Sequence, residues 1–168
     1  VGGCCTGLGI PPTSITRIIG IVKAYSTRVG NGPFPTELED EYGEELRKTG
    51  NEFGATTGRP RRCGWLDLVA LKYTTMINGF TELAITKLDV LSNLDKIEVC
   101  TGYVVDGNTT QRFPSDIRTL ERVRPVYETL PGWNEDITGI TRLEDLPSTA
   151  RDYLTFISDF LDVPQRLF

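Results

Sequence analysis

Histidine is absent from the 168 residues of this chain. Catalytic sites of the Ser-His-Asp and Cys-His types therefore cannot be completed within it, and neither can zinc sites with histidine ligands. Any proton transfer that the chain performs must use aspartate, glutamate, lysine, tyrosine or cysteine.

Cysteine pairs at short spacing are also absent. Cys4, Cys5, Cys63 and Cys100 are adjacent or far apart, and no Cys-x-x-Cys occurs. This spacing indicates neither a zinc knuckle nor a redox motif, and we expect reduced thiols in a cytoplasmic protein. The sequence has no run of about twenty apolar residues and no basic-then-apolar start typical of a secretory signal. We therefore expect no membrane partner.

Basic residues are fewer than acidic ones: the sequence has 18 Lys and Arg against 23 Asp and Glu, which gives a net charge of -5. Binding to nucleic acid needs a basic face, so we expect no nucleic-acid partner, although a local basic loop is compatible with this balance. A chain of this length can bury roughly two thirds of its unfolded surface in one core. No repeat or Pro-Gly-Ser linker divides it, so residues 1–168 are expected to form a single region.

Both ends of the sequence suggest a fragment. The first residue is Val1 instead of methionine, and the last residues, 163–168, run apolar to the end without a helix stop. We therefore expect a longer protein that is truncated on both sides.

Hydrophobic periodicity and turn residues predict alternating helices and strands. The clearest helix spans Leu66 to Ile77, where apolar residues recur every three or four positions, and we expect its apolar face to pack into the core. The other expected elements are a short helix after Pro12, a strand near Ile21, an acidic helix over 37–48 that ends at Gly50, strands at 83–85 and 97–105, a turn at Asp106-Gly107 followed by a strand at 109–112, an extended segment at 125–128 and a last helix from Ser148. This order predicts an α/β fold with a mostly parallel sheet, flanking helices and an antiparallel hairpin.

The most unusual segment lies between Gly54 and Gly64 and reads GATTGRPRRCG. Its small residues let a ligand approach the backbone, its threonines offer hydroxyl donors, and its three arginines create a local positive field. Pro60 biases Arg59 towards extended backbone, so Arg59 and Arg61 are expected to share one direction and Arg62 to point away. The segment predicts a carboxylate or phosphate site. The alternative is a solvated turn whose arginines pair with the acidic helix before it.

A second candidate segment, Thr86-Lys87-Leu88-Asp89, follows a short apolar strand, where α/β sheets place ligands. The Asp89 carboxylate can accept hydrogen bonds from both N1 and the exocyclic amine of guanine, while the Lys87 stem lies on the base. Adenine has no such pair of donors. The alternative is an ordinary Lys-Asp turn on the surface.

A third candidate is the stiff loop at residues 30–35, GNGPFP, which joins a strand to the acidic helix. Loops with rigidly fixed ends often hold ligands, and Val29 just before this one can offer an apolar side chain to a flat base. A packed proline loop is the alternative. Pro131-Gly132-Trp133 is likewise either a surface turn or a ligand wall.

Six strings of residues, taken together and in order, resemble the adenylosuccinate synthetase family, purine-pathway ligases that join IMP to L-aspartate with GTP. They are VKAYSTRVG at 22–30, GPFPTEL at 32–38, GATTGR at 54–59, RRCGWLD at 61–67, LAITKLDVL at 83–91 and YETLPGW at 127–133. The strings span nearly the whole chain, so the resemblance is more specific than any single motif.

The resemblance implies a role for each candidate segment. The loop that would close over L-aspartate consists of Ala55, Thr56, Thr57, Gly58, Arg59, Pro60 and Arg61. It further implies that Arg59 reaches the IMP ribose, that Arg61 meets the GTP phosphates and that Val29 lies against IMP. The residues that would hold guanine are Lys87, Leu88 and Asp89. Pro60 departs from the all-arginine form of the loop, which we expect to change loop stiffness without loss of function.

The resemblance also implies what lies outside this sequence. In the family the phosphate loop, the catalytic histidine and a catalytic aspartate that ligates Mg²⁺ lie near the N-terminus, so we expect no catalytic and no metal-binding residue in this chain. It implies a P-loop-NTPase-like parent fold, a homodimer, and a C-terminal portion that is inactive alone. The alternatives are a non-catalytic module that binds guanine nucleotides or anions, and a structural or dimerisation domain without ligand.

Overall fold

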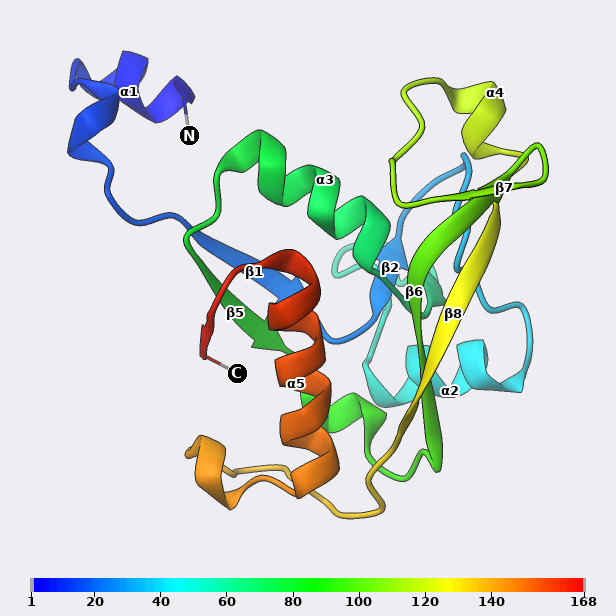
Figure 1. Cartoon of the computed structure of the whole chain (residues 1–168). Helices are drawn as coiled ribbons and strands as arrows, with labels where there is room; N and C mark the ends of the chain where they lie inside the picture. Colours follow the sequence, from blue (N-terminus) through cyan, green and yellow to red (C-terminus); the bar gives the residue numbers. More distant parts are fainter. Residues whose placement is uncertain (1, 168) are drawn as a thin grey trace.

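The computed structural model describes residues 2–167 (Figure 1). Its helices are α1 (Gly2–Leu8), α2 (Glu41–Thr49), α3 (Leu68–Asn78), α4 (Ile117–Leu120) and α5 (Ser148–Leu161), with short 3-10 helices η1 (Pro12–Ser14), η2 (Leu88–Leu91) and η3 (Leu143–Asp145). Its strands are β1 (Ile19–Lys23), β2 (Ser26–Arg28), β3 (Arg62–Gly64), β4 (Leu66–Asp67), β5 (Glu82–Thr86), β6 (Lys96–Val105), β7 (Asn108–Thr110), β8 (Arg124–Pro131) and β9 (Gln165–Leu167).

A parallel sheet in the order β1-β5-β9 forms the first layer. Leu83 and Ile85 of β5 are fully buried and belong to the same core cluster as Leu154 and Ile157 of α5. Figure 1 shows α5 lying across this sheet. The hydroxyl of Tyr153 on α5 donates to the carbonyl oxygen of Ala24, just after β1, at 2.6 Å. Helix α5 therefore fixes the position of the carboxyl end of β1.

The opposite face of β1 is open in the described part of the chain. Alternate residues Ile19 and Ile21 are 44% and 80% exposed, and β1 is an edge of its sheet. Parallel sheets are normally covered on both faces. This face is therefore an apolar surface without a covering layer among residues 2–167.

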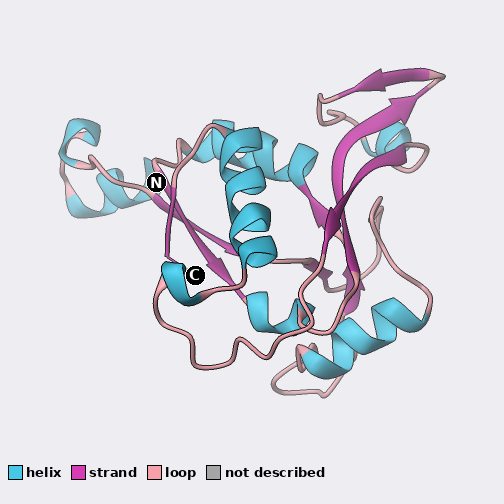
Figure 2. Cartoon of the chain, turned by 60° about the horizontal axis from the view of Figure 1, so that its bottom comes forward, coloured by secondary structure: helices cyan, strands magenta, loops and turns pink. Residues whose placement is uncertain are grey.

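The second sheet is built around the long strand β6. It pairs in parallel with β4 and antiparallel with β7 and β8, and the turn between β6 and β7 is made by Asp106 and Gly107, both with positive φ. Figure 2 shows the long strands of this sheet together at one side of the molecule. The predicted α/β fold, with a parallel sheet, flanking helices and an antiparallel hairpin, is confirmed.

Two predicted helices are present but differ in part from the prediction. The helix expected after Pro12 is only the single turn η1, since the β-branched residues that follow it favour extended backbone. Helix α3 is present, but Tyr73 and Ile77 on its predicted core face are 42% and 63% exposed. The helix instead packs on the main core through Leu68 and Leu71, on the neighbouring face, whereas Val69 is the buried residue of the predicted face within α3. Periodicity locates an apolar face, but burial of that face requires a neighbouring element.

Candidate ligand-binding site

The segment Glu52–Arg61, called the arginine loop below, is a closed turn with an exposed tip. Two backbone hydrogen bonds close its base: Gly54 N–H donates to Arg59 O at 2.8 Å, and Arg61 N–H donates to Glu52 O at 2.9 Å. Residues 55–60 are all exposed. The loop therefore presents the small residues and threonines of its tip to solvent from a fixed base.

The arginines of this region take different partners. Arg61 donates from Nη1 to Glu52 Oε2 at 2.8 Å. Arg62 forms an ion pair with Glu37 and donates to Gly32 O at 2.8 Å. Arg62 thus points away from Arg61, as the sequence predicted, while the side chain of Arg59 makes no hydrogen bond to any residue among 2–167.

Glu52 is a buried carboxylate that the sequence analysis did not single out. Its side chain is 1% exposed and accepts hydrogen bonds from Tyr25 Oη at 2.6 Å, from Lys23 Nζ at 2.7 Å and from Arg61. Burial acts to raise the pKa of Glu52, but these three donors outweigh it and hold the pKa at about 2. No local pattern marks Glu52, because two of its three partners, Lys23 on β1 and Tyr25 just after β1, are far away along the chain.

The residues predicted to hold guanine, Lys87, Leu88 and Asp89, are called the guanine segment below. Lys87 has a left-handed backbone conformation, with φ 63° and ψ 28°, and η2 follows it directly. Leu88 is only 4% exposed, so it can reach a ligand only through its backbone, whereas Asp89 is exposed. A cavity of about 210 Å³ lies between this segment and the loop Ile137–Ile140. The sequence did not indicate that loop, since Ile-Thr-Gly-Ile reads as an ordinary turn.

Gly50, at the end of α2, joins the arginine loop to the guanine segment. Lys87 Nζ donates to its carbonyl oxygen at 2.9 Å. A Cβ on Gly50 would lie 2.2 Å from Tyr25 Oη, the same hydroxyl that donates to Glu52. The φ of Gly50 is -75°, so the glycine is required for space and not for a left-handed cap. Gly50 therefore lies between Lys87 of the guanine segment and the Tyr25–Glu52 hydrogen bond at the base of the arginine loop.

The environment of Tyr25 is buried. Burial raises the pKa of Tyr25, and the hydrogen bond to Glu52 raises it further. Lys87 contacts Gly50 beside this tyrosine, whereas Asp89 lines the cavity next to the loop Ile137–Ile140. The structure thus places Lys87 near the base of the arginine loop.

Val29 directly follows β2. Strand β2 pairs antiparallel with β3, and its last residue, Arg28, is opposite Arg62. The side chain of Val29 is 69% exposed.

Trp133, in contrast, is neither a surface turn nor a ligand wall. It is 2% exposed and its ring packs on Tyr153, with a centroid distance of 5.9 Å. Its ring is buried in the apolar core.

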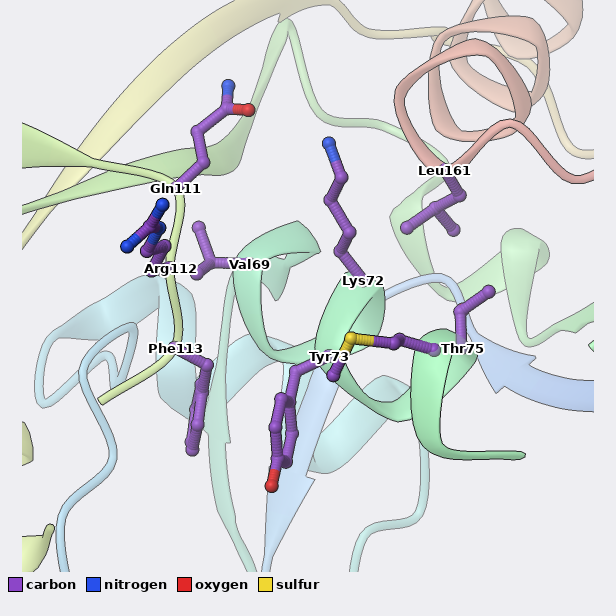
Figure 3. A pocket seen from close by; sticks show the side chains of 9 residues that line it. Val69, Lys72, Tyr73, Thr75, Gln111, Arg112, Phe113 and Leu161 are labelled. Carbon is purple, nitrogen blue, oxygen red and sulfur yellow. The ribbon is translucent and has the colours of Figure 1, made fainter. Parts of the chain in front are cut away.

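A larger hollow of about 620 Å³, the α3 groove, lies along α3 (Figure 3). The residues that line it are Val69, Lys72, Tyr73, Thr75, Met76, Gln111, Arg112, Phe113 and Leu161. The rings of Tyr73 and Phe113 face one another in Figure 3, with a centroid distance of 5.2 Å. None of the predicted site residues lines this groove, so it is separate from the candidate site.

Within residues 2–167, no three His, Cys, Asp or Glu side chains come close enough together to hold a metal ion. The four cysteines in that range are free thiols. No helix in the same part of the chain is long and apolar enough to cross a bilayer.

The whole chain, residues 1–168, matches the sequence model of the family described as adenylosuccinate synthetase. An adenylosuccinate synthetase of Salinibacter ruber is 66% identical over 96% of this chain, and one of Yarrowia lipolytica is 58% identical over 98% of it. The chain spans 37% and 38% of the length of these two relatives. A solved structure described as fully ligated adenylosuccinate synthetase from Plasmodium falciparum is similar with a TM-score of 0.93 and 42% identity, over 98% of this chain and 40% of that one. The chain belongs to the adenylosuccinate synthetase family.

Proposed function

We propose that this chain is the C-terminal portion of a GTP-dependent ligase that joins IMP and L-aspartate to form adenylosuccinate in AMP biosynthesis. Family membership supports the function. The 37% of the relative's length that the chain spans supports its being a portion of a longer enzyme. The observation that carries the proposed function is the meeting of the arginine loop and the guanine segment at Gly50.

In this proposal the arginine loop binds L-aspartate. Residues 55–61 surround the substrate, with backbone N–H groups and threonine hydroxyls as neutral donors. Arg59 and Arg61 meet its carboxylates, since a guanidinium can donate two parallel hydrogen bonds to a carboxylate. Arg59 also reaches the ribose of IMP, and Val29 lies against IMP.

The guanine of GTP occupies the cavity beside η2. The exposed carboxylate of Asp89 accepts from N1 and the exocyclic amine, and the stem of Lys87 lies along the base while its ammonium stays on Gly50 O. Leu88 contributes its backbone, because its side chain is buried. In this proposal Arg61 also meets the GTP phosphates.

The proposed reaction has two steps. The O6 atom of IMP takes the γ-phosphoryl group of GTP, and the amine of L-aspartate then displaces phosphate from the resulting 6-phosphoryl-IMP. The residues of this chain contribute position and charge, because arginine stays protonated and cannot act as a base at neutral pH. Mg²⁺ would neutralise phosphate charge. Among residues 2–167 no three His, Cys, Asp or Glu side chains are grouped so that they could hold the ion.

A chimera tests the proposal directly. This chain replaces the matching 162 residues of the Salinibacter ruber synthetase, and adenylosuccinate formation is measured. We expect turnover. A chimera that binds GTP or L-aspartate without turnover would favour the non-catalytic module, and one that binds neither would favour a structural domain.

Arg59→Leu in the same chimera tests the role of the loop. A charge-assisted contact contributes about 1.5–3 kcal/mol, so the KM for L-aspartate should rise about tenfold to a hundredfold. The matched control is Arg142→Leu, which removes an exposed arginine paired with Glu144 at η3. An equal KM in both variants contradicts the assignment.

We further propose a cytoplasmic homodimer. The free thiols of the described residues are consistent with a reducing compartment. Light scattering of the active chimera measures its mass, and a monomer that turns over would contradict the dimer.

A further inference from the structure

Glu52 has no part in the roles proposed so far, although it is one of two buried carboxyl groups among residues 2–167. The other, Asp67, has a structural explanation: it accepts from the first amides of α3 and from the hydroxyl of Tyr103. Glu52 caps no helix. Its side chain instead accepts from Arg61 of the arginine loop, from Lys23 at the end of β1 and from Tyr25 just after it.

The carboxylate of Glu52 holds two cations at once. Oε1 accepts from Lys23 and Tyr25, and Oε2 accepts from Arg61. One negative charge therefore meets two positive charges, and the cluster keeps one positive charge in excess. The side chains of Lys23 and Arg61 are 30% and 32% exposed, so this excess charge is accessible from solvent.

The backbone of Glu52 is fixed on both sides. Its N–H donates to Arg47 O of α2 at 2.8 Å, and its carbonyl oxygen accepts from Arg61 N–H at 2.9 Å. The side chain thus starts from a rigid point between α2 and the arginine loop. Arg61 is held to Glu52 through both its backbone and its guanidinium.

We propose that Glu52 is a positioning residue of the L-aspartate site, which anchors Arg61 beside Lys23 and leaves their excess positive charge for a carboxylate or phosphate of the substrates. This inference rests on the proposed function of the arginine loop for its ligand. The anchoring itself rests on the geometry alone.

Kinetics of the chimera test the positioning role. Glu52→Gln keeps the size of the side chain but removes its charge, so the KM for L-aspartate should rise about tenfold to a hundredfold while the KM for IMP changes little. Glu52 acts through Arg61, so adding Arg61→Lys should raise that KM much less than the product of the two single effects. An unchanged KM, or single effects that multiply, would overturn the positioning role.

Amide hydrogen exchange on the 168-residue chain tests the anchoring without turnover. Glu52→Gln should speed exchange about tenfold or more at the amides of Gly54 and Arg61, with the amides of α5 unchanged. Glu82→Gln is the matched control, because it makes the same substitution in Glu82, at the start of β5, which forms an ion pair with Arg17. Equal exchange at the loop base in both variants would overturn the anchoring.

Two further outcomes separate the claims. If Glu52→Gln does not fold, Tyr25→Phe removes one of the three hydrogen bonds, and the same two amides should still exchange faster. An inactive wild-type chimera would refute the proposed function but not the anchoring. An active wild-type chimera together with unchanged loop exchange in Glu52→Gln of the 168-residue chain would refute the anchoring alone.

Discussion

The buried carboxylate of Glu52 predicts how the stability of the chain depends on pH. Its pKa is about 2 in the folded chain, against an ordinary value of 4.5. A lowered folded pKa stabilises the fold at pH values above 4.5, and this contribution is lost as the pH falls through 2. At about 1.4 kcal/mol for each tenfold change in proton affinity, the difference of 4.5 - 2 gives about 3 kcal/mol.

Urea unfolding of the wild type and of Glu52→Gln measures this contribution, because the neutral amide mimics the protonated carboxyl. The wild type should be more stable by about 3 kcal/mol at pH 7, by roughly 1.4 kcal/mol at pH 3 and by about 0.4 kcal/mol at pH 2. The pKa of Asp67 is raised by burial, so its contribution is lost as the pH rises, but it is common to both proteins and cancels. A difference that stays constant from pH 7 to pH 3 would refute the reasoning.

Three further substitutions have defined outcomes. Asp89→Asn should lower the preference of the chimera for GTP over xanthosine triphosphate, whose base has an acceptor in place of the amine; a fixed ratio of kcat/KM values would show that Asp89 does not read the base. Asp67→Ala removes a helix cap and orphans the buried hydroxyl of Tyr103, so urea unfolding should show a loss of about 2–4 kcal/mol, and a loss under 1 kcal/mol would contradict this. Gly50→Ala places a Cβ 2.2 Å from Tyr25 Oη, so about 1–3 kcal/mol should be lost; an unchanged Tm would mean that this contact relaxes freely.

Elements with local signals could be predicted from the sequence. The Asp106-Gly107 turn forms because both residues adopt positive φ, and α5 carries an apolar stripe that packs on the parallel sheet. Helix α3 shows the limit of such signals. Its spacing predicts a helix, but the spacing cannot say whether another element covers Tyr73 and Ile77.

The candidate site was predictable only in part. The arginine loop and the guanine segment are each recognisable as continuous strings, and the resemblance gave them roles that stay predictions. Their meeting at Gly50 was not predictable, because it depends on the fold. The same holds for Glu52, whose partners Lys23 and Tyr25 are 29 and 27 residues away along the chain.

The open face of β1 affects how the chain behaves in the test tube. Ile21 is 80% exposed on a strand whose outer N–H and C=O groups have no neighbouring strand among residues 2–167. Such a strand can add to the same strand of another molecule, and partly unfolded chains then aggregate faster than they refold. Heating scans at high concentration would report this aggregation and not equilibrium unfolding, so dilute samples and chemical denaturant are the appropriate conditions.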